Sequence, residues 1–332
     1  MLSGTGEEVD APTAGRTDNV IDVRGLCKSY GGTRALENVS FTVGGGEVFG
    51  YLGPNGAGKT TTINILCGLL TCDAGELRIH GLDINEESIA VKQRIGVVPE
   101  ESNLYPELTC WRNLEYVGEL YGLSRAVRRK RVNDLLETFD LCDKKTAPFR
   151  ALSRGMKRRL TVAAALVHSP EIVFLDEPTA GLDVPSARTL RSVVRAMNRD
   201  GTTVFLTTHN LAEAEALCSR VLVLVKGQVA AQGTVAEIRH QVDRARVLCV
   251  TLSDDVPEVS LRDACPSVRS ISRVNGAWRL EVVDTHTAVG QLLSFAEDQG
   301  LRVLEIGSEI ASFEEVFMTI LKDNGEKAQE SP

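Results

Sequence analysis

The sequence predicts an α/β protein with a mainly parallel sheet, a helical subdomain and a small α+β domain near its C-terminal end. Between residues 20 and 241, short apolar runs alternate with amphipathic segments, the order expected when helices cover a parallel sheet. Residues 109–139 interrupt this alternation, because they are helical in character throughout. After residue 246 the pattern changes again, to shorter strands and helices in a different order.

Five runs have the composition of strands that are buried on both faces. They are residues 48–52 (VFGYL), 94–98 (RIGVV), 172–175 (IVFL), 204–207 (VFLT) and 221–225 (VLVLV). Continuously apolar strands are typical of parallel sheets, where helices pack on both faces. Residues 183–199 lie between two of these strands and have amphipathic spacing, so we predict a helix there.

The residues after 246 predict a separate small domain. The expected order is strand 246–252, helix 258–264, strand 268–273, strand 278–283, helix 287–299, strand 302–307 and helix 312–321. Asn275-Gly276 between two β-rich runs is a hairpin signal. A βαββαβ order is typical of a ferredoxin-like module, here with an added terminal helix. One apolar face of that last helix is expected to pack on the small domain, and it consists of Phe313, Val316, Phe317 and Ile320.

Length and composition agree with this organisation. The 332 residues predict about two domains. We place the first at residues 20–241 and the second at residues 246–321. The first contains the helical subdomain, at residues 109–165. Residues 1–19 and 322–332 are polar and are expected to be flexible tails. The chain is 43% hydrophobic, and its 37 basic and 45 acidic side chains give a net charge of −8. This acidic balance, with only 5% aromatic residues, predicts no nucleic-acid partner.

The cysteines and the apolar segments indicate a cytosolic protein. The eight cysteines form no CxxC pair and have no zinc-ligand spacing, so most are expected to be buried apolar thiols in a reducing compartment. The first 19 residues contain no apolar core of a secretory signal. No stretch approaches 18 consecutive apolar residues, so we expect no direct membrane span.

A phosphate-binding loop follows the first buried strand. Its eight residues match the pattern GxxxxGK[ST], and they are Gly53, Pro54, Asn55, Gly56, Ala57, Gly58, Lys59 and Thr60, followed by Thr61. The glycines let consecutive backbone N–H groups curl around a polyphosphate, and the start of the following helix adds a favourable dipole. Lys59 offers a cation to the β- and γ-phosphates, and Thr60 offers a hydroxyl to Mg²⁺.

Two carboxylates end another predicted strand. Residues 172–177 read IVFLDE, and strand ends beside a phosphate loop are where an open α/β sheet places its ligands. Asp176 can accept hydrogen bonds from Mg²⁺-bound water, and Glu177 can orient or deprotonate an attacking water.

Three further motifs complete an ordered set. Residues 152–156 (LSRGM) precede a helical run and present donors at a helix N-terminus. Residues 180–183 (AGLD) follow IVFLDE, and residues 207–209 (TTH) place an imidazole at a strand end. This order, over residues 20–240, resembles the ATP-binding subunits of ABC transporters.

The resemblance implies a P-loop ABC ATPase core and assigns roles to further residues. Tyr30, in KSYG, falls where the family stacks an aromatic ring on adenine, although a core tyrosine is an alternative. Ser153 and Gly155 would touch the γ-phosphate of ATP held by a second subunit, so that two chains enclose two nucleotides. Asp183 would lie at that interface. His209 would contact the γ-phosphate and hold the attacking water.

The sequence departs from the family pattern at two places. Glu100 stands where the family commonly has glutamine, and its carboxylate can still bind Mg²⁺. The signature reads LSRGM where LSGGQ is commonest. Arg154 would add a cation near the phosphate, and Met156 cannot make the polar contacts of glutamine. We expect altered ATP affinity or dimer lifetime.

Other features resemble the drug-resistance branch of type-2 ABC exporters. They are Glu100-Glu101, the run Lys157-Arg158-Arg159 after the signature, and SFEEVF at residues 312–317. The resemblance implies a homodimeric subunit that uses ATP and Mg²⁺ at the cytoplasmic face of the cell membrane. Its nucleotide-driven dimerisation would drive export through a separately encoded, membrane-spanning permease subunit.

Three basic runs and three other functions stay open at this point. The runs 125–131 (RAVRRKR), 144–145 and 157–159 are either solvated helix faces or contacts for lipid headgroups or the permease. The functional alternatives are an import motor, a soluble ABC-type ATPase acting on ribosomes or DNA, and a GTPase or small-molecule kinase. The chain has no NKxD tetrad, which disfavours guanine recognition.

Overall fold

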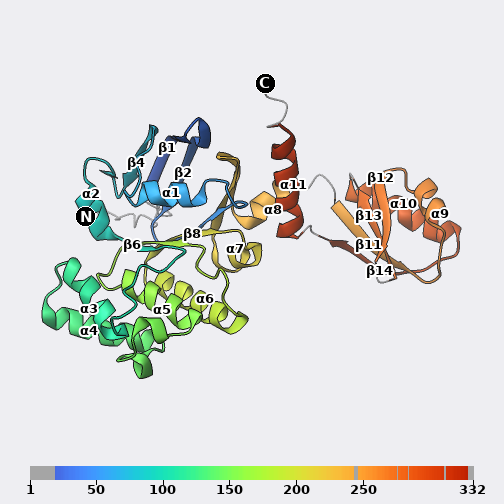
Figure 1. The fold of residues 1–332 in the computed structure, drawn as a ribbon. Coiled ribbons are helices and arrows are strands. Elements are labelled where there is room, and N and C mark those ends of the chain that lie inside the picture. Colours follow the sequence, from blue (N-terminus) through green and yellow to red (C-terminus); the bar gives the residue numbers. More distant parts are fainter. Residues whose placement is uncertain (1–18, 243–245, 275, 283, 310–311, 328–332) are drawn as a thin grey trace, which may run out of the picture. The chain divides into compact units, whose positions relative to one another are not determined.

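The computed structural model describes residues 19–242, 246–274, 276–282, 284–309 and 312–327. The chain forms two compact units, one built from residues up to 49 with 58–207, the other from 50–57 with those from 208 onward. Three sheets and the helices around them confirm the predicted mixture of an α/β core and an α+β addition (Figure 1). The predicted tails lie largely outside the described residues, and the domain boundary near 241–246 stays a prediction.

The largest sheet has six strands in the order β10-β9-β3-β8-β7-β6. Their bounds are β3 Val48–Leu52, β6 Ile95–Val98, β7 Ile172–Asp176, β8 Thr203–Thr208, β9 Arg220–Val225 and β10 Gln228–Gly233. The pairs β6–β7 and β7–β8 are parallel, and β9–β10 is an antiparallel hairpin. Every residue of β3, β7 and β8 is buried, as the continuously apolar runs predicted.

A second, antiparallel sheet was missed from the sequence. It has the order β2-β1-β4-β5 and consists of β1 Asn19–Tyr30, β2 Thr33–Gly44, β4 Ala74–Ile79 and β5 Leu82–Asp83. The register of β1 against β2 shifts between Val23 and Leu26, where Gly25 has a φ of +61°. Such an irregularity breaks the alternation of apolar and polar residues that signals a strand.

The described residues of the first unit contain six α-helices. They are α1 Lys59–Leu66, α2 Ser88–Arg94, α3 Cys110–Leu120, α4 Arg125–Thr138, α5 Arg154–Ala165 and α6 Val184–Arg199. The helical stretch predicted over 109–139 is thus divided into α3 and α4. Thr109 and Ser124 cap these two helices, because each side chain accepts a hydrogen bond from a backbone N–H in the first turn.

Arginines on α4 and α5 lie at the end of each other's helix. Arg131 on α4 donates to Leu166 O at 3.0 Å, and Arg159 on α5 donates to Phe139 O at 2.8 Å. The last carbonyls of a helix lack partners within it, and the helix dipole favours a cation there. These arginines are therefore structural, and the view of their basic runs as solvated faces is wrong for them.

The C-terminal module has the predicted βαββαβ order. It consists of β11 Arg246–Leu252, α9 Glu258–Ala264, β12 Val268–Val274, β13 Ala277–Val282, α10 Thr285–Asp298 and β14 Val303–Glu309. Its antiparallel sheet has the order β12-β13-β11-β14, with β11 and β13 in the middle. Asn275 lies outside the described residues, but β12 and β13 pair as a hairpin through Val274 and Ala277. One apolar core joins this sheet to α9 and α10.

The terminal helix α11 Phe313–Lys327 does not pack where it was predicted to pack. Its apolar face lies in one cluster with β9, α7 Leu211–Leu217 and α8 Val235–Val242. Figure 1 shows α11 beside α8. The members of that cluster from β9 are Val221, Val223 and Val225. The helix also continues beyond 321, the predicted end. Within the described residues, no helix is long and apolar enough to span a membrane.

The cysteines are less buried than expected. Cys67, Cys110 and Cys265 are buried, and burial raises the pKa of each of these thiols. Cys142 is exposed, and the other four are half-buried. All eight are free thiols.

Candidate functional site

The loop 53–58 joins β3 to α1 and curves as the sequence predicted. Gly56 and Gly58 have φ angles of +79° and +109°, which glycine adopts without a steric penalty. Within the loop Ala57 N donates to Pro54 O at 3.2 Å. Gly58 is the N-cap of α1 and makes no side-chain cap hydrogen bond, and the N-terminus of a helix favours an anion.

Close backbone contacts hold the same loop against β9. A Cβ atom on Gly53 would lie 2.4 Å from Leu224 O, so only glycine permits this approach. Beyond β9, Gly227 N donates to Ala57 O at 3.1 Å. The exposed residues Asn55 and Gly56 lie at the tip of the loop.

Lys59 and Glu177 form a buried ion pair. Lys59 Nζ lies 3.3 Å from Glu177 Oε1, and the two side chains are 7% and 9% exposed. Two charges at this depth stabilise each other, whereas either one alone would be strongly unfavourable. A polyphosphate that bound Lys59 would compete with Glu177 for the ammonium group. Thr60 and Thr61 follow Lys59 in the first turn of α1, with Thr60 exposed.

Thr207 orients the strand-end carboxylates, a role that sequence reasoning missed. Its hydroxyl donates to Asp176 Oδ1 at 2.5 Å, and its backbone oxygen accepts from Glu177 N at 3.1 Å. Glu177 has a φ of +45°, a conformation that costs a residue other than glycine about 1–3 kcal/mol. The neighbouring hydrogen bonds must therefore maintain the position of Glu177.

The donor set of this region fits Mg²⁺. Asp176 supplies a buried carboxylate, and Thr60 supplies a hydroxyl from the first turn of α1. Glu100 follows β6 after Pro99 and is exposed. These are hard oxygen donors, the ligands that Mg²⁺ prefers.

The signature residues begin α5. Ser153 caps the helix, because its hydroxyl accepts from Met156 N at 3.3 Å. Gly155 is buried, and a Cβ atom there would lie 2.3 Å from Ser186 Oγ on α6. Glycine at 155 therefore lets α5 approach α6, while Ser153 stays exposed.

Arg154 is exposed, and its guanidinium contacts its own chain beside this motif. Its Nη2 donates to Ala180 O at 3.1 Å, and its guanidinium occupies the space where a side chain on Gly181 would lie. Arg154, at which the signature differs from the family pattern, thus contacts the AGLD segment of its own chain. The expectation that Arg154 adds a cation near the phosphate stays a prediction.

The remaining predicted residues lie at the surface. Tyr30 ends β1 and is 49% exposed, so the alternative of a core tyrosine is wrong. Asp183 precedes α6 and is exposed, and its side chain makes no cap hydrogen bond. His209 directly follows β8 and is also exposed.

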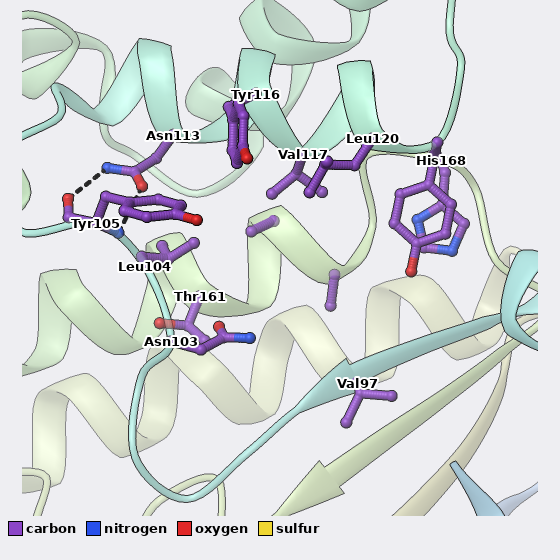
Figure 2. A pocket seen from close by; sticks show the side chains of 13 residues that line it. Val97, Asn103, Leu104, Tyr105, Asn113, Tyr116, Val117, Leu120, Thr161 and His168 are labelled. Carbon is purple, nitrogen blue, oxygen red and sulfur yellow. Dashed lines mark hydrogen bonds between the residues drawn. The ribbon is translucent and has the colours of Figure 1, made fainter. Parts of the chain in front are cut away.

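A pocket of about 300 Å³ lies among β6, α3 and α5 in the first unit (Figure 2). Asn113 on α3 ties its backbone segment together, accepting from Tyr105 N at 2.9 Å and donating to Tyr105 O at 3.1 Å. At the other end the rings of Tyr121 and His168 stack with centroids 3.6 Å apart. Burial lowers the pKa of His168, which keeps the ring neutral at pH 7. Sequence reasoning did not identify this pocket, because its residues come from separate segments.

The phosphate loop, its lysine and the strand-end carboxylates together define a nucleotide-hydrolysing P-loop protein. The family model described as "ABC transporter" matches residues 36–180, and one described as "ATP-binding protein DrrA1-3-like, C-terminal domain" matches 233–321. The linearmycin resistance ATP-binding protein LnrL of Bacillus subtilis (strain 168) is 33% identical over 309 residues, which cover 91% of this chain and 98% of that protein.

Two further proteins extend this similarity. The Nod factor export ATP-binding protein I of Ralstonia nicotianae is 37% identical over 315 residues, covering 95% of this chain and 97% of that one. A solved ATP-binding cassette, a dimeric post-hydrolysis state bound to ADP and Pi, has a TM-score of 0.60 and 28% identity over 64% of this chain and 98% of that one. The chain belongs to the ATP-binding subunits of ABC transporters, in the branch with a DrrA-like C-terminal domain, and it is an ATPase.

Proposed function

We propose that this chain binds ATP with Mg²⁺, dimerises around two nucleotides and drives export through a separate membrane-spanning permease at the cytoplasmic face of the membrane. The observation that carries the proposal is the buried Lys59–Glu177 pair beside Asp176 and the phosphate loop. Export is favoured over import because the relatives are named for linearmycin resistance and Nod factor export. An action on ribosomes or DNA finds no support in a net charge of −8.

Each residue of the site has a role in this proposal. The N–H groups of residues 53–58 and the ammonium of Lys59 hold the phosphates. Thr60, Asp176 and Glu100 hold Mg²⁺, which when bound neutralises phosphate charge. When phosphate takes Lys59, the Glu177 carboxylate is released to accept a proton from the attacking water.

The signature residues and three surface residues complete the site in the dimer. Tyr30 stacks on adenine and His209 contacts the γ-phosphate. Ser153, Gly155 and Asp183 face the nucleotide and the loop of the partner subunit. Two observations support these roles. Ser153 and Asp183 are exposed, and the similar cassette bound to ADP and Pi is a dimer.

Equilibrium dialysis with radiolabelled ATP tests the nucleotide and metal roles. We expect the wild-type chain to retain ATP, and more of it when Mg²⁺ is present, because Asp176 would help to hold a metal ion whose charge would offset that of the phosphates. Asp176→Asn should retain ATP in EDTA but lose the Mg²⁺-dependent gain. Competition by unlabelled GTP and by unlabelled ATP is the control. If unlabelled GTP displaces the radiolabelled ATP more strongly than unlabelled ATP does, the GTPase alternative is favoured. Absence of ATP retention by folded protein would overturn the proposal.

The permease contact is proposed at the pocket of Figure 2 and the adjoining exposed face of α4. Tyr105 and Leu120 line the pocket and are 52% and 67% exposed, which is unusual for large apolar side chains and typical of interaction sites. Arg129 and Lys130 are exposed on α4. Arg128, by contrast, donates to Leu123 O at 2.8 Å and to Glu119, so it is a structural residue.

Charge reversal tests this contact. We expect Arg129→Glu with Lys130→Glu to weaken co-purification with the proposed membrane-spanning permease, because a cationic surface is replaced by an anionic one. ATP retention should not change. The matched control is Arg269→Glu with Arg302→Glu, two exposed arginines of the C-terminal module with the same change in charge. Equal co-purification of both double variants would argue against α4.

A further inference from the structure

We propose that Arg158 is a positioning residue for ATP hydrolysis, which from α5 holds the backbone on both sides of Glu177 and next to Glu100. The inference rests on the proposed function, because it concerns the same carboxylates. In the sequence Arg158 belongs to the basic run 157–159, which is expected at the surface. In the structure it is 8% exposed and points to the ends of two strands.

The first set of contacts surrounds Glu177. Arg158 Nη2 donates to Asp176 O at 2.6 Å, and Arg158 Nε donates to Pro178 O at 2.9 Å. These carbonyls belong to the residues directly before and after Glu177. Because Glu177 has a φ of +45°, its backbone needs such external support, and the direction of its carboxylate follows from that backbone.

The second set of contacts reaches the segment after β6. Arg158 Nη1 donates to Glu100 O at 3.1 Å and also to Pro99 O. One side chain therefore connects the signature helix to the backbone that carries Glu100 and to that of Asp176, the two carboxylates proposed for Mg²⁺. Only a guanidinium has donors on three nitrogens in a fixed plane, and the single ammonium of lysine cannot reach all these acceptors together.

The next residue provides a matched comparison. Arg159 lies on the same helix and is half-buried, but its acceptors are Phe139 O at the C-terminal end of α4 and Asp140. A lysine at either position removes one guanidinium and keeps the charge. Only the change at 158 removes contacts to the backbone of the catalytic carboxylates.

The experiment compares wild type, Arg158→Lys and Arg159→Lys. We expect Arg158→Lys to lower kcat by about 100-fold, the effect of a small displacement of reacting groups. The affinity for Mn²⁺, measured by EPR in the presence of ADP, should fall as well, while ATP affinity in EDTA stays unchanged. Arg159→Lys should leave all three quantities unchanged. As a second variant, Arg158→Ala should regain part of its rate when millimolar guanidinium ion is added.

The outcomes separate this inference from the proposed function. If wild type hydrolyses ATP and Arg158→Lys equals it in kcat and Mn²⁺ affinity, the role of Arg158 is overturned and the proposed function stands. Equal losses in both lysine variants, or loss of ATP affinity in EDTA together with kcat, would show a merely structural role and would also overturn the inference. If wild type does not hydrolyse ATP, the proposed function itself fails.

Discussion

Glu177→Gln is expected to lower the rate of ATP hydrolysis by about 10²–10⁴-fold, the usual contribution of a positioned general base. Glutamine has the shape of glutamate but cannot accept a proton from water at neutral pH. The substitution also removes the anion that lies 3.3 Å from Lys59 Nζ, so Glu177 no longer competes with phosphate for the ammonium. We therefore expect ATP to bind at least as well as in wild type and to remain unhydrolysed.

Two measurements check this expectation. Phosphate release gives the rate, and light scattering after size-exclusion chromatography gives the oligomeric state with ATP and Mg²⁺. The variant should accumulate as an ATP-bound dimer, whereas wild type should return to monomer as ATP is consumed. Glu171→Gln is the control, because Glu171 lies at the surface just before β7 and should not affect the rate. Hydrolysis by Glu177→Gln at the wild-type rate would rule out the general-base role.

Phe313→Ala is expected to destabilise the contact of α11 with β9 by about 3–5 kcal/mol, the range for removing a buried phenylalanine ring. Phe313 is 1% exposed and lies in the cluster with Val221 and Val223 of β9 and Ile238 of α8. The cavity that alanine leaves cannot be filled by movement of β9 alone, since that strand is hydrogen-bonded to β10 within the sheet.

Native-state hydrogen exchange measures this effect locally. The amides of α11 and β9 should exchange with a free energy of opening lower by that amount, while those of β7 should change little. Met318→Ala is the control in the same helix, because Met318 is 50% exposed and surface substitutions usually change stability by less than about 0.5 kcal/mol. Equal effects of the two substitutions would mean that α11 does not cover β9 in solution.

The site residues differ in how well the sequence predicted them. The phosphate loop was predicted together with its strand and helix, since all its features are contiguous between residues 48 and 66. The contacts of Asp176 were not, because Thr207 lies 31 positions further along the chain. Arg158 was assigned to a basic surface run, and only the fold brings Pro99 and Pro178 to its side chain.

The terminal helix shows the same division. The sequence predicted its apolar face correctly but assigned that face to the neighbouring domain. Amphipathic spacing tells which side of a helix is buried, but it carries no information on which surface covers it. That surface is β9, more than 80 positions earlier in the chain. The sequence predicted β9 as a strand buried on both faces but did not indicate that α11 covers its valines.

Local order along the chain was therefore enough to define the class of protein, the phosphate loop, the strand-end carboxylates and the βαββαβ module. Hydrophobic periodicity and short motifs act over a few neighbouring residues, and those interactions are written in consecutive positions. The pairing of Lys59 with Glu177, the guanidinium contacts of Arg158 and the packing of α11 arose only when distant segments met in the folded chain. Such contacts depend on the relative placement of sheets and helices, which no single stretch of sequence encodes.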